Sequence, residues 1–323
     1  MSTAPAPAPA LEALGLAKHY PIRQGWHRPP RTVRALDDVS FVLPPGRTLA
    51  VVGESGCGKT TLARQLTLIE RPSAGTLCIG GASPGDDEAS LRRLRRRIQM
   101  VFQNPFASLN PRKTVSAILE EPLTIAGELD AAARGERVLE LLGRVGLSAE
   151  QARRYPHMFS GGQRQRIAIA RAMALEPAVI VADEPVSALD VSIQAQVLNL
   201  FMDLQERHGT AYVFVSHDLA VVEHMAHEVL VMYLGRTVEL APAAALFAAP
   251  AHPYTRALLA TRPRLDARVR RTVVPIRGEP PSPLDPPAGC AFHPRCPEAV
   301  PRCRDERPAL RALGDRRVAC HLA

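Results

Sequence analysis

Short apolar runs alternate with segments of helical periodicity along most of this chain. The apolar runs predict strands at Thr48–Val52, Ile98–Phe102, Val179–Ala182 and Tyr212–Val215, with a last strand at Val229–Tyr233. Helical spacing predicts helices at 61–69, 91–97, 163–175, 193–207 and 243–247. Strand and helix follow one another in turn, so we expect an α/β fold whose mostly parallel sheet is covered on both faces.

The pattern and composition of residues change in three other parts of the chain. Residues 104–160 carry turn chemistry at Asn104-Pro105 and Asn110-Pro111 and then helical periodicity, which predicts a helical subdomain over about 104–170. Residues 1–10 form a Pro-Ala tract that we expect to be disordered, and 263–323 form an extension rich in Pro, Arg and Cys. The main domain is therefore expected over 11–262.

The most specific motif follows the first of these strands. It reads Gly53-Glu54-Ser55-Gly56-Cys57-Gly58-Lys59-Thr60, with Thr61 inside the next helix. In such a loop, glycines let backbone N–H groups turn toward phosphates, the lysine reaches the β- and γ-phosphates, and the threonine hydroxyl ligates Mg²⁺. A glycine-rich turn with a chance lysine is the alternative, but the strand before the loop and the helix after it favour nucleotide binding.

Two further strands deliver polar residues where ligands bind in open α/β sheets. Asp183 and Glu184 follow Val179–Ala182, and His217 follows the strand that ends near Val215. Asp183 suits Mg²⁺, Glu184 suits the base that activates a water, and His217 can contact the γ-phosphate. A solvated acidic loop and a structural histidine are the alternatives. Gln103 ends a third strand.

Bulk properties narrow the class of protein. The formal net charge is +8, but residues 251–323 hold 14 arginines against 7 acidic residues, so the charge lies mainly in the extension. Binding to nucleic acid is therefore a minor hypothesis. The sequence shows no apolar run of membrane-spanning length and no signal peptide at its start, which predicts a cytoplasmic location.

A second backbone-donor turn makes the chain recognisable. Ser160-Gly161-Gly162-Gln163 opens a helix, and Ser187-Ala188-Leu189-Asp190 follows the two carboxylates. With the phosphate loop, Gln103 and His217, these motifs in this order resemble the ATP-binding subunits of ABC transporters. The resemblance covers nearly the whole chain and implies an ABC ATPase fold in which two subunits enclose two ATP molecules.

The same resemblance implies roles for individual residues. Gln103 would be the Q-loop sensor and, with Thr60 and Asp183, a ligand of Mg²⁺. Asp190 would lie in the D-loop, and the Ser160 turn would clamp ATP bound to the partner subunit. Tyr20 would stack on adenine, although Trp26, which follows an unusual insert, is an alternative.

Four stretches are similar to the peptide-importer branch of this family, in particular to dipeptide-permease subunits. They are Asn104-Pro105, 156–166, 185–191 and His252-Pro253-Tyr254-Thr255. This likeness implies ATP-driven import of dipeptides or short oligopeptides from the cytoplasmic face of the membrane. It implies two permease subunits, a peptide-binding protein and a second ATPase subunit as partners, with a heterodimer favoured over a homodimer.

Two other functions are alternatives to peptide import. One is a soluble ATPase that acts on DNA or ribosomes, but only 56 residues separate Gln103 from Ser160, too few for a long coiled-coil arm. The other is a non-catalytic regulatory module, which the presence of both Glu184 and His217 disfavours.

Cysteines raise two separate questions. Cys290, Cys296, Cys303 and Cys320 lie in an extension too poor in apolar residues to fold alone, where a metal would act as a staple. Similarity to peptide-importer ATPases favours a [4Fe-4S] cluster; zinc and metal-free buried thiols are the alternatives. Cys57 stands at a helix start, where a thiol pKa tends to fall, or it is simply a tolerated variable position.

Overall fold

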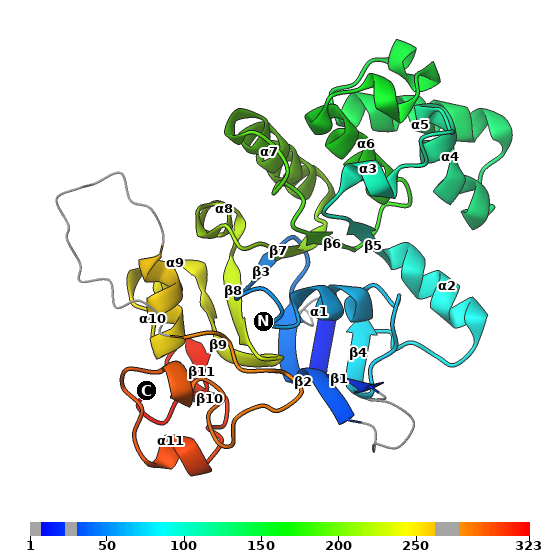
Figure 1. The fold of residues 1–323 in the computed structure, drawn as a ribbon. Coiled ribbons are helices and arrows are strands. Elements are labelled where there is room, and N and C mark those ends of the chain that lie inside the picture. Colours follow the sequence, from blue (N-terminus) through cyan, green and yellow to red (C-terminus); the bar gives the residue numbers. More distant parts are fainter. Residues whose placement is uncertain (1–7, 23–30, 262–277) are drawn as a thin grey trace, which may run out of the picture.

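The structure is a computed structural model that describes residues 8–22, 31–261 and 278–323. Its strands form an eight-stranded sheet in the order β10-β11-β9-β8-β3-β7-β6-β5 and a three-stranded sheet in the order β2-β1-β4 (Figure 1). The predicted tail lies largely in residues 1–7, Trp26 lies in 23–30, and the predicted boundary at 263 lies in 262–277. Residues 1–7, 23–30 and 262–277 fall outside the described residues, whereas residues 8–10 of the predicted tail are described and Ala10 is buried.

The larger sheet confirms the mostly parallel architecture. Its parallel strands are β3 (Thr48–Val52), β5 (Ile98–Val101), β6 (Val179–Asp183), β7 (Ala211–Val215) and β8 (Glu228–Tyr233). Antiparallel strands β9 (Arg236–Pro242), β11 (Arg316–Val318) and β10 (Arg311–Leu313) extend one edge. The expectation that Val229–Tyr233 is the last strand was therefore wrong.

The smaller sheet did not appear among the predicted elements. It is antiparallel and consists of β1 (Leu11–Ile22), β2 (Arg31–Leu43) and β4 (Ala74–Ile79). Register shifts interrupt β1 between Ala13 and Leu16 and again before His19. Each shift breaks the two-residue alternation of buried and exposed side chains. Because that alternation is what predicts a half-buried strand from a sequence, β1 was not predicted.

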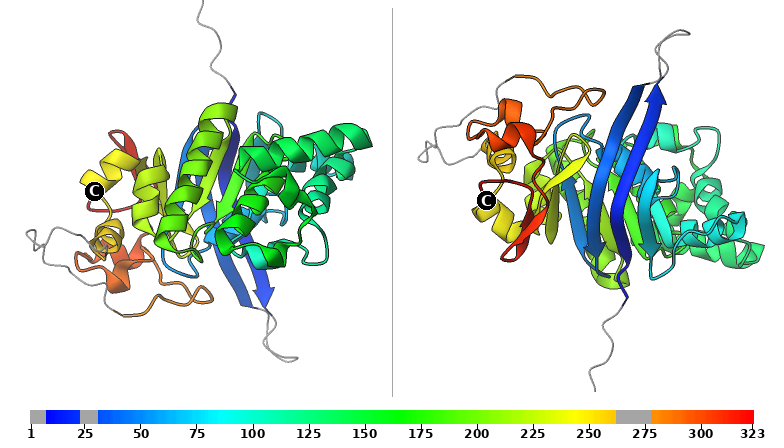
Figure 2. Two further views of the ribbon diagram at one scale, coloured as in Figure 1. Left: turned by 90° about the horizontal axis from the view of Figure 1, so that it is seen from above. Right: turned by 90° about the horizontal axis from the view of Figure 1, so that it is seen from below.

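Helices cover the larger sheet and form a lobe beside it (Figures 1 and 2). The covering helices are α1 (Lys59–Leu66), α2 (Glu88–Arg97), α7 (Val191–His208), α8 (Leu219–Met225), α9 (Ala243–Ala248) and α10 (Pro253–Ala260). The lobe contains α3 (Pro105–Ser108), α4 (Val115–Ala126), α5 (Ala131–Arg144), two short 3-10 helices (Ala149–Arg153 and Pro156–Met158) and α6 (Gly161–Met173). One apolar cluster runs from α4 and α5 through α6 to α7 and the sheet, so the lobe is packed onto the larger sheet.

The C-terminal extension shares the core of the main domain. Its strand β11 pairs with β9, and Phe292, which is 1% exposed, packs in an apolar cluster with Tyr233 of β8 and Tyr254 of α10. A short 3-10 helix (His293–Arg295) and α11 (Arg302–Asp305) complete it. The extension was expected to need a metal because it is poor in apolar residues, but it gains its apolar contacts from the main domain.

Within 8–22, 31–261 and 278–323, none of the helices combines the length and the apolar character needed to cross a membrane.

Candidate functional site

The phosphate loop joins β3 to α1 and requires glycine at two positions. Gly53 has a φ of +154°, and a Cβ there would lie 2.3 Å from the Met232 carbonyl oxygen; at Gly58, with a φ of +105°, a Cβ would lie 2.4 Å from the Ala35 carbonyl oxygen. Lys59 folds back over the loop, and its Nζ donates to the carbonyl oxygens of Gly53 (2.7 Å) and Glu54 (3.0 Å). The loop is therefore a closed cradle with an ammonium group held inside it.

Helix α1 begins at this cradle without a side-chain cap. Gly58 occupies the N-cap position, it offers no side-chain acceptor, and the first turn contains no acidic residue. The first N–H groups of a helix have no partners within the helix and carry the positive end of its dipole. This helix start is thus suited to an anion such as a phosphate.

Thr60 and Asp183 supply oxygen ligands beside the cradle. Asp183 ends β6, is 7% exposed, and hydrogen-bonds with the side chain of Thr60. Burial raises the pKa of Asp183, the Thr60 hydrogen bond and the charge of Lys59 lower it, and the charge of Glu184 raises it further. A divalent cation would remove the cost of the buried charge, and hard oxygen donors are what Mg²⁺ prefers. These two residues fit the expected Mg²⁺ site.

Three polar residues from different elements converge at the mouth of the cradle. Glu184 Oε2 accepts a hydrogen bond from Gln103 Nε2 (2.7 Å), and Glu184 Oε1 lies 3.2 Å from His217 Nδ1. The Glu184 side chain is 19% exposed, whereas that of His217 is 63% exposed. The carboxylate is thus held between two side chains that can orient it, in a position open to a ligand and a water.

A cavity of about 490 Å³ connects these groups. Its walls include most of the phosphate loop together with the three converging residues, and they are lined by Val33, Arg34, Ala35, Ser55, Gly56, Gly58, Lys59, Thr60, Thr61, Gln103, Glu184, His217, Leu234, Gly235 and Pro283. Arg34, Gly235 and Pro283 were not among the predicted site residues. They lie outside any local motif and reach the cavity only through the β1–β2 sheet, the β8–β9 turn and the extension.

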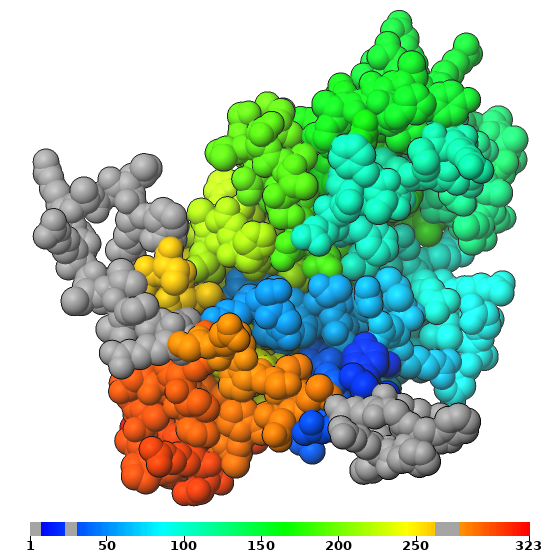
Figure 3. Space-filling view, viewed as in Figure 1, coloured from blue at the N-terminus to red at the C-terminus, as the bar shows by residue number. Residues whose placement is uncertain are grey.

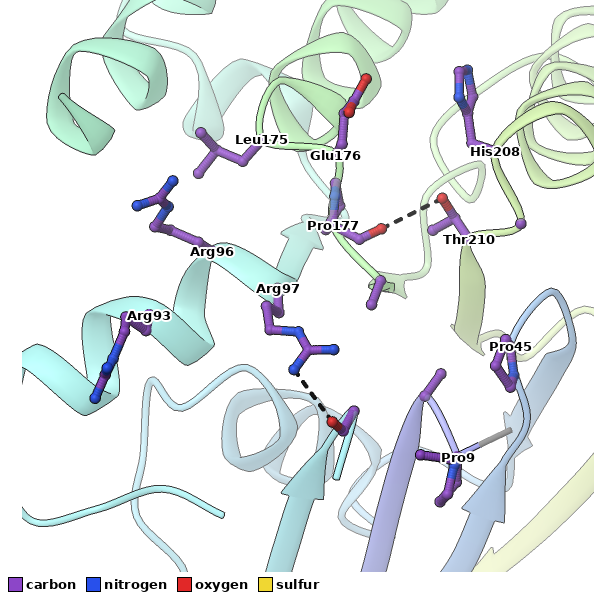
Figure 4. A pocket seen from close by; sticks show the side chains of 15 residues that line it. Pro9, Pro45, Arg93, Arg96, Arg97, Leu175, Glu176, Pro177, His208 and Thr210 are labelled. Carbon is purple, nitrogen blue, oxygen red and sulfur yellow. Dashed lines mark hydrogen bonds between the residues drawn. The ribbon is translucent and has the colours of Figure 1, made fainter. Parts of the chain in front are cut away.

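A larger cavity, of about 620 Å³, lies at the opposite edge of the sheet (Figure 4). Three of its charged side chains are already engaged: Arg96 pairs with Glu128, Arg97 donates to the carbonyl oxygens of Ile79 and Gly80, and Glu176 pairs with Arg137. It lies beside the strand starts, whereas ligands of open α/β sheets bind at the strand ends. The smaller cavity is therefore the candidate site.

The Ser160 turn is separate from this cavity. Ser160 and Gln163 cap the start of α6 reciprocally: the Gln163 N–H donates to Ser160 Oγ (3.3 Å) and the Ser160 N–H donates to Gln163 Oε1 (3.1 Å). Gly162 has a packing role, since a Cβ there would lie 2.3 Å from Ile193 Cγ2 of α7. Ser160 and Asp190 are exposed, and neither is among the residues that line the cavity.

Tyr20 is already engaged by neighbouring side chains. Its hydroxyl hydrogen-bonds with Glu70, and Lys18 Nζ lies 5.3 Å from the centre of its ring. It is not among the described residues that line the cavity. Stacking of Tyr20 on adenine therefore stays a prediction, and the alternative at Trp26 lies outside the described residues.

Cys57 does not have the lowered pKa that its position suggested. The residue is 4% exposed, and burial raises the pKa of its thiol above the ordinary value, although the charge of Lys59 opposes this. The helix start was expected to favour the thiolate, but burial penalises any charged form more strongly. Of the two interpretations of Cys57, this favours a tolerated variable position over a reactive thiol.

The four C-terminal cysteines do not form a ligand set in this arrangement. Burial is the main cause that raises the pKa of Cys290 and brings that of Cys296 to about 11. Nearby thiols contribute to both increases. Cys303 and Cys320 are buried. Within the described ranges, no group of three or more His, Cys, Asp or Glu side chains is placed to hold a metal ion. The structure thus gives neither the [4Fe-4S] cluster nor zinc any support.

Known families match two segments of the chain. Residues 36–187 match the ABC transporter family, and residues 238–303 match the C-terminal region of oligopeptide/dipeptide transporters. The first match contains the phosphate loop, the Ser160 turn and the Asp183–Glu184 pair. The second contains His252, Tyr254, Arg295 and three of the four C-terminal cysteines.

Full-length relatives and solved structures agree with these matches. The chain is 59% identical to the di/tripeptide transport ATP-binding protein DppF of Pseudomonas aeruginosa (strain UCBPP-PA14), with 97% of each chain covered. It is 56% identical to the dipeptide transport ATP-binding protein DppF of Escherichia coli (strain K12), covering 97% of this chain and 94% of that one.

A solved dimer of the ATP-binding cassette MJ0796, bound to ADP and Pi, is 29% identical. It superimposes with a TM-score of 0.64 over 72% of this chain and 98% of that one. Motifs, site geometry and relatives therefore lead to one assignment: this chain belongs to the ABC transporter family, as an ATP-binding subunit that carries the oligopeptide/dipeptide transporter C-terminal region.

Proposed function

We propose that this chain is the ATP-hydrolysing subunit of an ABC importer for dipeptides or short oligopeptides. The observation that carries the proposal is the convergence of Gln103, Glu184 and His217 beside the phosphate loop. Glu184 accepts a proton from the attacking water, while Gln103 and His217 orient its carboxylate. Lys59 would contact the β- and γ-phosphates. Thr60 and Asp183, with Gln103 as a further ligand, would hold Mg²⁺, which would supply positive charge beside the phosphates.

The second half of each nucleotide site comes from another chain. Ser160 and Asp190 are exposed, and neither they nor Gly161 to Gln163 line the cavity of their own subunit, which supports a role against ATP bound to a partner. We propose a heterodimer with a sister ATPase, bound at the cytoplasmic face of the membrane to two permease subunits. A peptide-binding protein delivers the substrate to this complex.

We further propose that the chain divides functionally as its composition indicates. Residues 1–10 form a tail, 11–262 the ATPase domain with its helical subdomain at about 104–170, and 263–323 the extension. The helices of the lobe are short, the longest having 14 residues. A soluble ATPase that acts on DNA or ribosomes would be expected to have a long coiled-coil arm. The short helices therefore favour a lobe that contacts a permease subunit.

The test replaces the proposed base. Glu184→Gln keeps the size of the side chain but cannot accept a proton, so turnover of ATP by the assembled complex should fall by about 100-fold or more while ATP still binds. Glu206→Gln, which changes an exposed carboxylate on α7, is the matched control and should leave turnover unchanged. Turnover of the Glu184→Gln complex at the wild-type rate would refute the base role.

Transport is measured separately from hydrolysis. Cells that lack the gene should lose uptake of radiolabelled dipeptides, and the wild-type chain but not Glu184→Gln should restore it. Hydrolysis by the purified chain should rise with permease subunits and remain unchanged with nucleic acid. Normal dipeptide uptake in the deletion strain would contradict peptide import, and stimulation by nucleic acid alone would favour the soluble ATPase.

An iron–sulfur cluster in the extension is a separate hypothesis. Its support is chemical: four cysteines lie in one short segment, and thiolates are the ligands that such clusters use. Iron and acid-labile sulfide should then be found in anaerobically purified protein. Protein without iron but with one zinc per chain, or without any metal, would exclude the cluster.

A further inference from the structure

A residue of the C-terminal extension contacts the phosphate loop directly. Arg295 donates to both carboxylate oxygens of Glu54, from Nη1 to Oε2 at 2.7 Å and from Nη2 to Oε1 at 3.1 Å. The Arg295 side chain is 7% exposed and that of Glu54 is 24% exposed. Such two-point pairing is both strong and geometrically specific, so it fixes the orientation of the Glu54 carboxylate and places a positive charge beside it.

The backbone of Glu54 is held from the same side. Its N–H donates to the hydroxyl oxygen of Tyr254 (2.8 Å), which belongs to α10, close to the extension. Its carbonyl oxygen accepts from Lys59 Nζ (3.0 Å). Backbone N–H, carbonyl and carboxylate of this loop residue are therefore all engaged, two of them by groups that come 200 residues or more later in the chain.

The groups that hold Glu54 are themselves rigidly packed. The rings of Tyr233, Tyr254 and Phe292 are almost fully buried, with centroids 4.8 to 5.3 Å apart. Phe292 lies one turn before Arg295, whose Nη1 also donates to the Tyr233 hydroxyl oxygen (3.3 Å). Although burial by itself lowers the pKa of Arg295, the hydrogen bonds with Glu54 and Tyr233 hold it above the ordinary value.

A Glu54 carboxylate without a positively charged partner would weaken the binding of ATP. The loop turns its N–H groups toward the negatively charged phosphates, and a negative charge on the loop itself repels them. The extension also reaches the cavity through Pro283, and it lies against the rest of the molecule in the space-filling view (Figure 3). Its position is thus suited to act on ATP binding.

We infer that Arg295 is a positioning residue for ATP: together with Tyr254 it holds the phosphate loop in its binding shape and neutralises Glu54, so that affinity for ATP depends on the C-terminal extension. The inference rests on the proposed function, because it concerns the same nucleotide site. It assigns to the extension a role that needs no metal.

The test compares single and double variants of the purified full-length chain, with Mg²⁺-ATP as the probe. Arg295→Gln leaves the Glu54 carboxylate unpaired and should raise the Kd for ATP by about 10-fold. Arg295→Lys keeps the charge but loses the two-point contact, so its Kd should lie between that of the wild-type chain and that of Arg295→Gln. Arg295→Gln combined with Glu54→Gln removes the unpaired charge as well, and its Kd should return to within about threefold of wild type.

Two controls separate positioning from a loss of folding. Arg302→Gln removes an arginine of the same extension that pairs with the exposed Glu306, and its Kd should match wild type. In the assembled complex, Arg295→Gln should raise the KM for ATP while kcat at saturating ATP stays near the wild-type value. A damaged fold would instead lower kcat and would persist in the double variant.

The possible outcomes are distinct. A wild-type chain that binds no ATP would refute the proposed function itself. A wild-type chain that binds ATP, with an Arg295→Gln variant of equal affinity, would overturn only the role of Arg295. A double variant that binds as weakly as the single variant would also overturn it, because removal of the Glu54 charge would then have no effect.

Discussion

Glu184 shows how one residue of the site is constrained. Its φ is +47°, a region that residues other than glycine rarely adopt, and its N–H donates to the Val215 carbonyl oxygen (2.9 Å). Such a backbone costs free energy and persists only where its surroundings hold it in place. Here the contact with β7 and the two side-chain partners Gln103 and His217 keep the carboxylate at the mouth of the cradle.

Cys57 leads to a prediction about reactivity. Burial raises its pKa and so favours the neutral thiol over the thiolate, which is the form that reacts. Alkylation of Cys57 by iodoacetamide should be slower than that of the partly exposed Cys78 by on the order of tenfold, as followed by mass spectrometry. Rapid labelling of Cys57 that ATP prevents would contradict this.

At the scale of elements, the link between α10 and the extension predicts a pH dependence. His252 caps α10, where its Nδ1 accepts from the Tyr254 N–H (3.0 Å), and its ring also bonds with the Ala319 backbone. Burial lowers the pKa of His252 from 6.5 to about 3. Between those values the unfolded chain binds more protons than the folded chain, so stability is present above pH 6.5 and is lost as the pH falls.

The size of this effect can be measured by urea unfolding. From pH 7 to pH 5 the free energy of unfolding should fall by about 2 kcal/mol through His252 alone. His252→Asn retains an acceptor at the cap but does not titrate in this range, so its loss over the same interval should be smaller by that amount. An equal loss in both proteins would show that other groups are responsible.

At the scale of the whole molecule, the separation of Ser160 from the cavity predicts a division of labour between subunits. Ser160→Arg should leave the Kd of the isolated chain for ATP within about twofold of wild type, because Ser160 lies outside that cavity. If Ser160 faces the partner's nucleotide as proposed, the same change would place a bulky side chain against that nucleotide in the assembled complex, and hydrolysis should fall by about 10-fold or more.

Lys59→Ala provides the contrast for this experiment. It removes the ammonium inside the cradle and should weaken ATP binding by the isolated chain itself. Since Ser160 also caps α6, thermal unfolding should be followed in parallel to show that the variant is folded. Weak ATP binding by a folded, isolated Ser160→Arg chain would place Ser160 in its own site and refute the division.

The sequence alone determined the phosphate loop, the positions of Asp183, Glu184 and His217, and the strand–helix alternation of the core. These features are local: a strand, a tight glycine turn and a helix start lie within about ten residues, so their pattern is visible in the chain. Only the tertiary structure decided that Cys57 is buried, that β9 to β11 extend the sheet, and that Arg295 reaches Glu54 across 241 positions. Burial and contacts between distant segments depend on how the helices and strands pack. The spacing of residue types within a short segment does not contain that information.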